Sequence, residues 1–214
     1  MIRLRTLIEG VIEERVSDVV YHATSYPKLL RIIESDKFKL TSLRETGWEV
    51  DAKWADELNI RDYYVMSVAR SLSSEFIRLD QNLTVIRLDG RKLNSNLKST
   101  AFDYTHFAKR FTDIDPGFDE MEDRIISRKP HITNFSKYIT GIYLSPDYIR
   151  RKIGKDGILG AGYQMLLIGV EELFKRDIPI YMCKDSKTPS FSPKCRIESM
   201  DEFAAITGEF SKGD

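Results

Sequence analysis

The residues of this chain that are best suited to chemistry lie at the ends of short apolar runs. His22 and Thr24 end the run Val19–Ser25, whose apolar and β-branched residues predict a strand. A neutral imidazole can hydrogen-bond a hydroxyl group of a ligand. The simpler alternative is a half-buried histidine whose ring hydrogen-bonds a backbone carbonyl, and this run alone leaves both interpretations open.

A second candidate pair follows another apolar run. The residues Tyr63–Ser71 predict a buried strand that ends in a turn. Ser67 brings a hydroxyl group to this strand and Arg70 brings a guanidinium group, which can pair with a phosphate.

Carboxylates are concentrated further along the chain, from Asp119 to Asp123. Glu120 and Glu122 are separated by one residue, so on a strand both would point to the same side. Such a density of like charge is costly unless something cationic lies there. The alternative is an ordinary acidic turn in solvent.

Hydrophobic periodicity predicts the elements that position these residues. We expect an α+β fold with a mixed sheet, because alternating or apolar runs predict strands near Val19–His22, Phe38–Thr41, Tyr63–Val68, Thr84–Leu88 and Tyr138–Leu144. Helical spacing predicts an amphipathic N-terminal helix, a helix within Tyr26–Ser35, one within Ile158–Arg176 and a short one within Met200–Ile206.

The length bounds the domain organisation. A chain of 214 residues can bury one substantial core and is short for two. We expect a domain over residues 1–150, braced by the N-terminal helix, and a helix-strand extension over residues 151–214 that packs on the same domain.

Composition narrows the classes of partner and compartment. Lysine plus arginine equals aspartate plus glutamate at 33 each, so any nucleic acid would have to bind a local patch. Cys183 and Cys195 lack a second pair that would suggest zinc, so we expect no metal and a reducing compartment. The N-terminus is too charged for a signal sequence and no apolar run reaches about 18 residues, which predicts a cytoplasmic protein without a membrane partner.

The stretch YHATSYPKLLRIIESDKFKLTS, from Tyr21 onwards, resembles the opening of ADP-ribosyltransferases of the histidine-bearing branch. This branch includes diphtheria-toxin-like, poly-ADP-ribose-polymerase-like and DNA-modifying toxin enzymes, whose first strand ends in Tyr-His-Gly/Ala/Phe-Thr. Ser67 is the closest match to the serine of the family's Ser-x-Ser/Thr strand end, although Ala69 replaces the second hydroxyl. Glu120-x-Glu122 is similar to the family's Glu-x-Glu pattern, and the resemblance spans roughly residues 19–144.

The resemblance implies an ADP-ribosyltransferase-like split mixed sheet and NAD as the substrate, without a metal. In the implied reaction, Glu122 stabilises oxocarbenium character at the ribose, as in glycoside hydrolysis, and Glu120 contacts the acceptor. The NAD-binding residues that it implies are His22, Thr24, Ser67 and Arg70.

The acceptor stays open between protein and nucleic acid. Glu-x-Glu is typical of arginine-modifying members, which carry arginine where this chain has His22. A toxin, a defence protein or a phage modifier of host machinery would each fit the resemblance. Two alternatives remain: a non-catalytic binding or assembly module of the same fold, favoured by Ala69, and a 2′-phosphate-removing relative, which needs several pocket arginines that the sequence does not place.

Overall fold

The computed structural model describes residues 17–45, 53, 55–56, 60–74, 77, 84–101, 122–153, 160–183 and 189–210, and only the backbone of residues 98–101 and 122. Within these residues the chain is an α+β protein with five α-helices, a mixed main sheet and a small second sheet. The predicted N-terminal helix lies outside the described residues.

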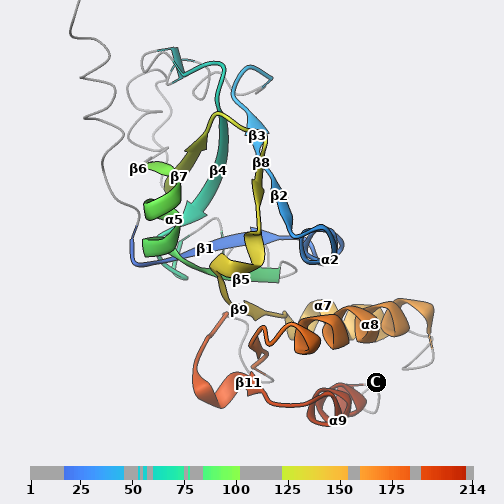
Figure 1. Cartoon of the computed structure of the whole chain (residues 1–214). Helices are drawn as coiled ribbons and strands as arrows, with labels where there is room; N and C mark the ends of the chain where they lie inside the picture. Colours follow the sequence, from blue (N-terminus) through green and yellow to red (C-terminus); the bar gives the residue numbers. More distant parts are fainter. Residues whose placement is uncertain are drawn as a thin grey trace, which may run out of the picture.

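The main sheet holds the candidate residues on its central strands. Eight strands follow the order β11-β10-β9-β5-β1-β4-β7-β6, and β3 pairs with β4 as a ninth (Figure 1). Their bounds are β1 (Val19–Thr24), β3 (Thr41–Ser42), β4 (Tyr64–Ala69), β5 (Thr84–Asp89), β6 (Lys98–Ala101), β7 (Glu122–Ser127), β9 (Ile139–Tyr143), β10 (Ile180–Tyr181) and β11 (Arg196–Ile197). The pairing of β9 with β10 is parallel, which makes the sheet mixed.

The two halves of this sheet meet at a narrow junction. β1 pairs with β5 along its whole length, from Val19 to Thr24. With β4, however, its register contains the single pair Tyr21–Ala69. Figure 1 shows β1 running across the direction of β4. The strands therefore diverge beyond the junction, and the end of β1 that carries His22 and Thr24 is left open to one side.

Helices cover this open end and the lower part of the sheet. The helices are α2 (Tyr26–Ser35), α5 (Gly90–Asn96), α7 (Pro146–Ile153), α8 (Ala161–Lys175) and α9 (Met200–Phe210), with short 3-10 turns η1 (Phe135–Tyr138) and η3 (Pro193–Cys195). α2 begins with Pro27 in its first turn, where a missing N–H costs nothing. It ends at Asp36, whose left-handed backbone (φ 49°) turns the chain into the next strand.

One apolar core joins the two parts of the chain. Val20 of β1, Leu29 of α2, Val170 of α8 and Phe203 of α9 are each fully buried in the same cluster. In Figure 1, α7, α8 and α9 lie together below β1 and β5. Residues 160–210 thus contribute to the core that also holds β1 and β4.

The structure differs from the sequence prediction in three places. The predicted strand Phe38–Thr41 is divided: β2 (Lys37–Lys39) pairs with β8 (His131–Thr133) in the second sheet, and β3 pairs with β4. The acidic-turn alternative is wrong at Glu122, which begins β7. Cys183 and Cys195 form a disulfide with their Cα atoms 4.8 Å apart, whereas we expected reduced thiols.

Within the described residues, no helix has both the length and the apolar character needed to cross a bilayer.

Candidate functional site

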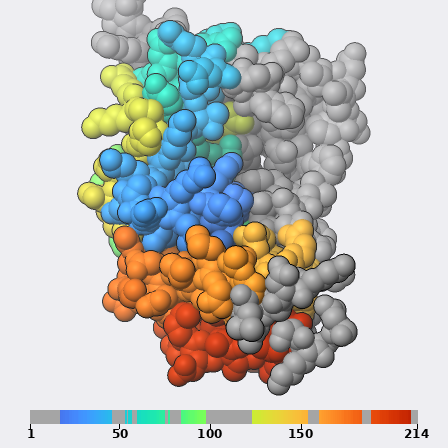
Figure 2. All heavy atoms as spheres, turned by 90° about the vertical axis from the view of Figure 1, so that its right-hand side faces the viewer, coloured from blue at the N-terminus to red at the C-terminus, as the bar shows by residue number. Residues whose placement is uncertain are grey.

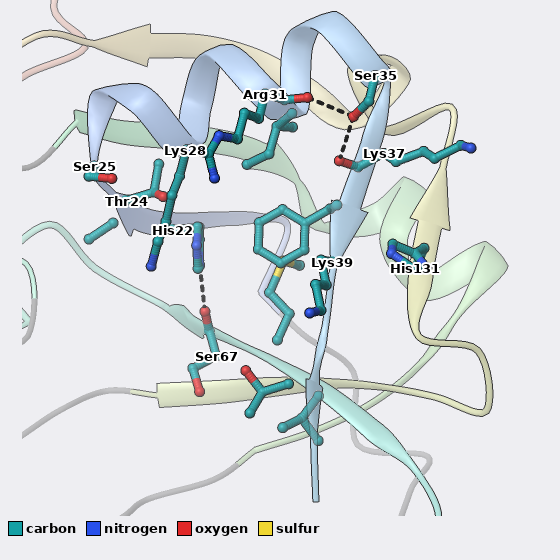
Figure 3. Close-up of a pocket in the computed structure, with 16 residues that line it drawn as sticks. His22, Thr24, Ser25, Lys28, Arg31, Ser35, Lys37, Lys39, Ser67 and His131 are labelled. Atoms are coloured by element: carbon teal, nitrogen blue, oxygen red, sulfur yellow. Dashed lines mark hydrogen bonds between the residues drawn. The ribbon is translucent and has the colours of Figure 1, made fainter. Parts of the chain in front are cut away.

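A cavity of about 770 Å³ lies at the open end of β1. Its walls come from the end of β1, one face of α2, the strands β2 and β3, and the first half of β4 (Figure 3). Apolar side chains such as Ile32, Phe38 and Met66 line it together with hydroxyl groups and cations. A concave site of this size and mixed lining is typical of small-molecule binding.

Three of the predicted site residues meet on this cavity. His22 and Thr24 arrive from β1, and Ser67 arrives from β4. His22 Nδ1 lies 2.9 Å from the carbonyl oxygen of Ser67, 45 residues along the chain. A carbonyl oxygen can only accept, so Nδ1 carries the proton and a neutral His22 has Nε2 as a hydrogen-bond acceptor.

Both interpretations of His22 are therefore compatible with its position. The ring makes the backbone contact that the simpler alternative requires, and it also lines the cavity with a second nitrogen unused by that contact. Phe38 packs at its edge, with ring centres 4.8 Å apart. Burial lowers the pKa of His22, although the Ser67 carbonyl opposes this shift, and the charge of Lys28 lowers the pKa further. The imidazole is therefore neutral near pH 7.

Cations dominate the charge of the cavity. Its basic lining residues are Lys28, Arg31, Lys37, Lys39 and His131. No carboxylate lines it in the part of the chain that the structure describes, and none of the lysines or Arg31 forms an ion pair there. Ser35 orders the corner between α2 and β2, because its hydroxyl donates to the carbonyls of Arg31 and Lys37. The site is therefore suited to an anionic ligand.

Arg70, the fourth predicted NAD-binding residue, lies elsewhere. Its guanidinium group pairs with Asp123 at 3.7 Å and does not line the cavity. Asp123 is 1% exposed and also accepts a hydrogen bond from the backbone N–H of Ser17. The pair holds β7 to β4 near the junction, which is a structural contact that the acidic run alone did not reveal.

The two glutamates are described to different degrees. Glu120 lies outside the described residues, and for Glu122 the backbone alone is described. Glu122 pairs with Ala69 on β4, and Ala69 in turn pairs with Tyr21 on β1. The same register aligns the backbone of Glu122 with Tyr21 on β1, one residue from His22 in the sequence.

Sequence reasoning missed the cations of the cavity. Lys28, Arg31 and Ser35 recur at three- and four-residue spacing, which places them on one face of α2. This spacing could have predicted a basic face on α2. The positions of Lys37 and Lys39 at the cavity could not be predicted from the sequence, because they depend on the pairing of β2 with β8 outside the main sheet.

Comparisons of the chain with protein-family models, with curated proteins and with solved structures found no match.

Proposed function

We propose that this protein is an NAD-dependent ADP-ribosyltransferase that transfers ADP-ribose to a macromolecular acceptor, protein or nucleic acid. One observation carries the proposal. His22, Thr24 and Ser67, which the resemblance to ADP-ribosyltransferases implies as NAD-binding residues, line a single cavity although they come from two strands far apart in the chain. The junction of β1 with β4 through one register pair also supports the split sheet of that family.

The cavity has groups for each polar part of NAD. His22 Nε2 accepts a hydrogen bond from a ribose hydroxyl, since Nδ1 is held by Ser67. Figure 3 shows Lys28 and Arg31 directed toward the interior, where they pair with the diphosphate. These two cations take the phosphate role that the sequence assigned to Arg70.

The reaction breaks the bond between nicotinamide nitrogen and ribose C1′. The electron pair of this bond leaves with nicotinamide, and positive charge develops at C1′. Glu122 stabilises that charge, and a nucleophilic atom of the acceptor bonds to C1′ and gives up its proton. Glu120, two residues earlier, contacts the acceptor. The products are nicotinamide and an ADP-ribosylated acceptor.

The substitution Glu122→Gln tests this proposal. It keeps the shape of the side chain and removes its charge, so NAD should still bind while turnover falls by two to three decades, the usual effect of about 3 to 4 kcal/mol of lost electrostatic stabilisation. Titration calorimetry measures NAD binding, and nicotinamide release measures turnover. Glu171→Gln, on the exposed side of α8, is the matched control and should match wild type. Equal turnover in wild type and Glu122→Gln would show that this carboxylate is not catalytic.

Two observations favour a second candidate, a binding module of the same fold. No carboxylate lines the cavity within the described residues, and Ala69 stands where the family pattern has a hydroxyl. A wild-type protein that binds NAD but releases no nicotinamide, with or without lysate acceptors, would support this module.

A further inference from the structure

The cations at the cavity continue onto the exposed face of the second sheet. In the pairing of β2 with β8, Lys39 lies opposite His131. Phe38 and Ile132, the middle residues of the two strands, are buried in the core. Because side chains alternate along a strand, the other face of this sheet is exposed and carries Lys37, Lys39 and His131.

The basic surface extends through the turn before β8. The backbone N–H of Leu40 donates to the carbonyl of Pro130 at 2.9 Å, which fixes this turn beside the end of β2. Arg128 and Lys129 are exposed there. The guanidinium of Arg128 donates to the hydroxyl of Tyr63 at 2.8 Å and lies 5.4 Å from the centre of its ring. Figure 2 shows β2 and β8, in light blue and yellow, side by side on one face above α2.

These cations form two groups. The inner cations, Lys28 and Arg31, lie on α2 and are directed toward the cavity in Figure 3. The outer cations are Lys37, Lys39, Arg128, Lys129 and His131. Figure 3 shows Lys37 and His131 pointing away from the interior, beyond β2. The diphosphate of NAD carries two negative charges, which the inner cations can neutralise. The diphosphate therefore does not need the outer cations, which remain available for another anionic ligand.

The outer cations also lack carboxylate partners in the part of the chain that the structure describes. Five other described surface cations have them: Arg44 pairs with Asp62, Arg61 with Asp56, Arg91 with Asp18, Arg150 with Asp147 and Arg196 with Glu198. Asp36, next to Lys37 in the sequence, accepts a hydrogen bond from the backbone N–H of Ser136 at 2.7 Å, and no described ion pair joins it to these cations. A chain of zero net charge thus concentrates unpaired positive charge beside its cavity.

We propose that the acceptor is a single-stranded nucleic acid, whose phosphates bind the outer cations while one base enters the cavity. The proposal rests on the transferase function proposed above and names its substrate class. A base within a duplex stack cannot reach ribose C1′ inside a cavity, so the strand must be single or locally opened. The Arg128–Tyr63 pair and the exposed ring of His131 offer flat surfaces on which bases stack, which carboxylates of an acidic protein would not use.

The chemical step is balanced without a further reactant. A nitrogen of the base bonds to C1′ of NAD, the bond from C1′ to nicotinamide breaks, and its electron pair leaves with nicotinamide. The proton displaced from the base nitrogen passes to solvent.

Binding to the outer cations can be measured without NAD. Fluorescence anisotropy with a labelled single strand of about 20 nucleotides, as DNA and as RNA, should show affinity that falls with salt, the logarithmic slope being about 0.7 for each phosphate contacted. The double variant Arg128→Glu, Lys129→Glu should bind at least tenfold more weakly, with a slope smaller by about 1.4 for two lost contacts. The double variant Arg151→Glu, Lys194→Glu changes the net charge equally at exposed positions outside the group of outer cations, and should bind like wild type. Equal losses in both variants, or a poly-glutamate chain that competes as well as the single strand, would overturn the proposal.

The same variants separate this inference from the proposed function. The Arg128→Glu, Lys129→Glu variant should bind NAD and release nicotinamide to water like wild type, because neither residue lines the cavity, while transfer of labelled ADP-ribose to the single strand falls at least tenfold. Wild type that hydrolyses NAD but modifies only proteins would overturn the nucleic-acid acceptor and leave the transferase intact. A wild type that binds single strands but not NAD would overturn the transferase.

Discussion

At the scale of single residues, the two ring nitrogens of His22 differ in role: Nδ1 makes a hydrogen bond to the backbone, and Nε2 is not used by that contact. Its Nδ1–H is bound by the Ser67 carbonyl, so the neutral ring can only accept at Nε2. Protonation would convert that acceptor into a donor next to Lys28 and bring positive charge into a buried position. Structural and functional roles of this histidine thus depend on the same neutral state.

This neutral state predicts a pH dependence of stability. The pKa of His22 is lowered in the folded protein, so as the pH falls below the ordinary value of about 6.5 the unfolded chain binds the proton first. The free energy of unfolding should therefore decrease from pH 6.5 downwards, by up to about 1.4 kcal/mol per pH unit from this group. His22→Asn keeps a donor near the Nδ1 position and does not titrate, so its urea-derived stability should fall less steeply. His131→Asn, at an exposed histidine, is the control and should keep the wild-type slope. A slope in His22→Asn equal to that of wild type would assign the pH dependence to other groups.

At the scale of elements, the wall of the cavity depends on how α2 packs on α8. The hydroxyl of Tyr26 donates to the carbonyl of Leu166 at 2.8 Å. A Cβ atom at Gly169 would lie 2.2 Å from that hydroxyl and 2.4 Å from a methyl carbon of Leu30. The absence of a side chain at Gly169 therefore sets the distance between the two helices, and with it the position of Lys28 and Arg31.

Gly169→Ala should push α2 away from α8. We expect a loss of about 1 to 3 kcal/mol in the free energy of unfolding, as for other overpacked contacts, and weaker NAD binding because α2 carries cavity residues. Gly208→Ala in α9 is the matched control: nothing lies within 4 Å of its added Cβ, so the helix should gain up to about 1 kcal/mol. Urea unfolding and calorimetry measure the two quantities. Gly169→Ala with unchanged stability and affinity would show that the α2–α8 contact does not position the cavity.

The elements also show where sequence reasoning succeeds. Strands β1, β4, β5 and β9 and helices α2, α8 and α9 were predicted, because each has a long enough apolar pattern. β7 was missed because its first residues, Glu122 and Asp123, are acidic, and Asp123 is buried only through its partner Arg70. β8, the disulfide and the division of the predicted strand Phe38–Thr41 into β2 and β3 were missed for a related reason: these pairings join distant segments and leave no local pattern. In the site, the residues at strand ends were predicted, whereas the group of outer cations is formed only by the tertiary arrangement.

At the scale of the whole molecule, the C-terminal helices are part of the core that supports the cavity. Leu166 and Leu173 of α8 and Phe203 of α9 are buried in the same cluster as Val20 and Leu29. The hydroxyls of Tyr163 and Thr207 also hydrogen-bond, linking α8 to α9. Because these contacts are shared, we expect residues 17–210 to unfold as one cooperative unit.

Phe203→Ala tests this cooperativity. Phe203 is fully buried, so its truncation should lower the free energy of unfolding by about 3 to 5 kcal/mol. Far-UV circular dichroism follows the helices, and tryptophan fluorescence follows the N-terminal part, since both tryptophans, Trp48 and Trp54, precede residue 60. The two transitions should coincide in wild type and shift together in Phe203→Ala. Ala205→Ser, at an exposed position of α9, should cost about 0.5 kcal/mol and serves as the control. A fluorescence transition that stays at its wild-type position while the circular dichroism transition shifts would show that residues 160–210 fold separately and that the cavity does not depend on them.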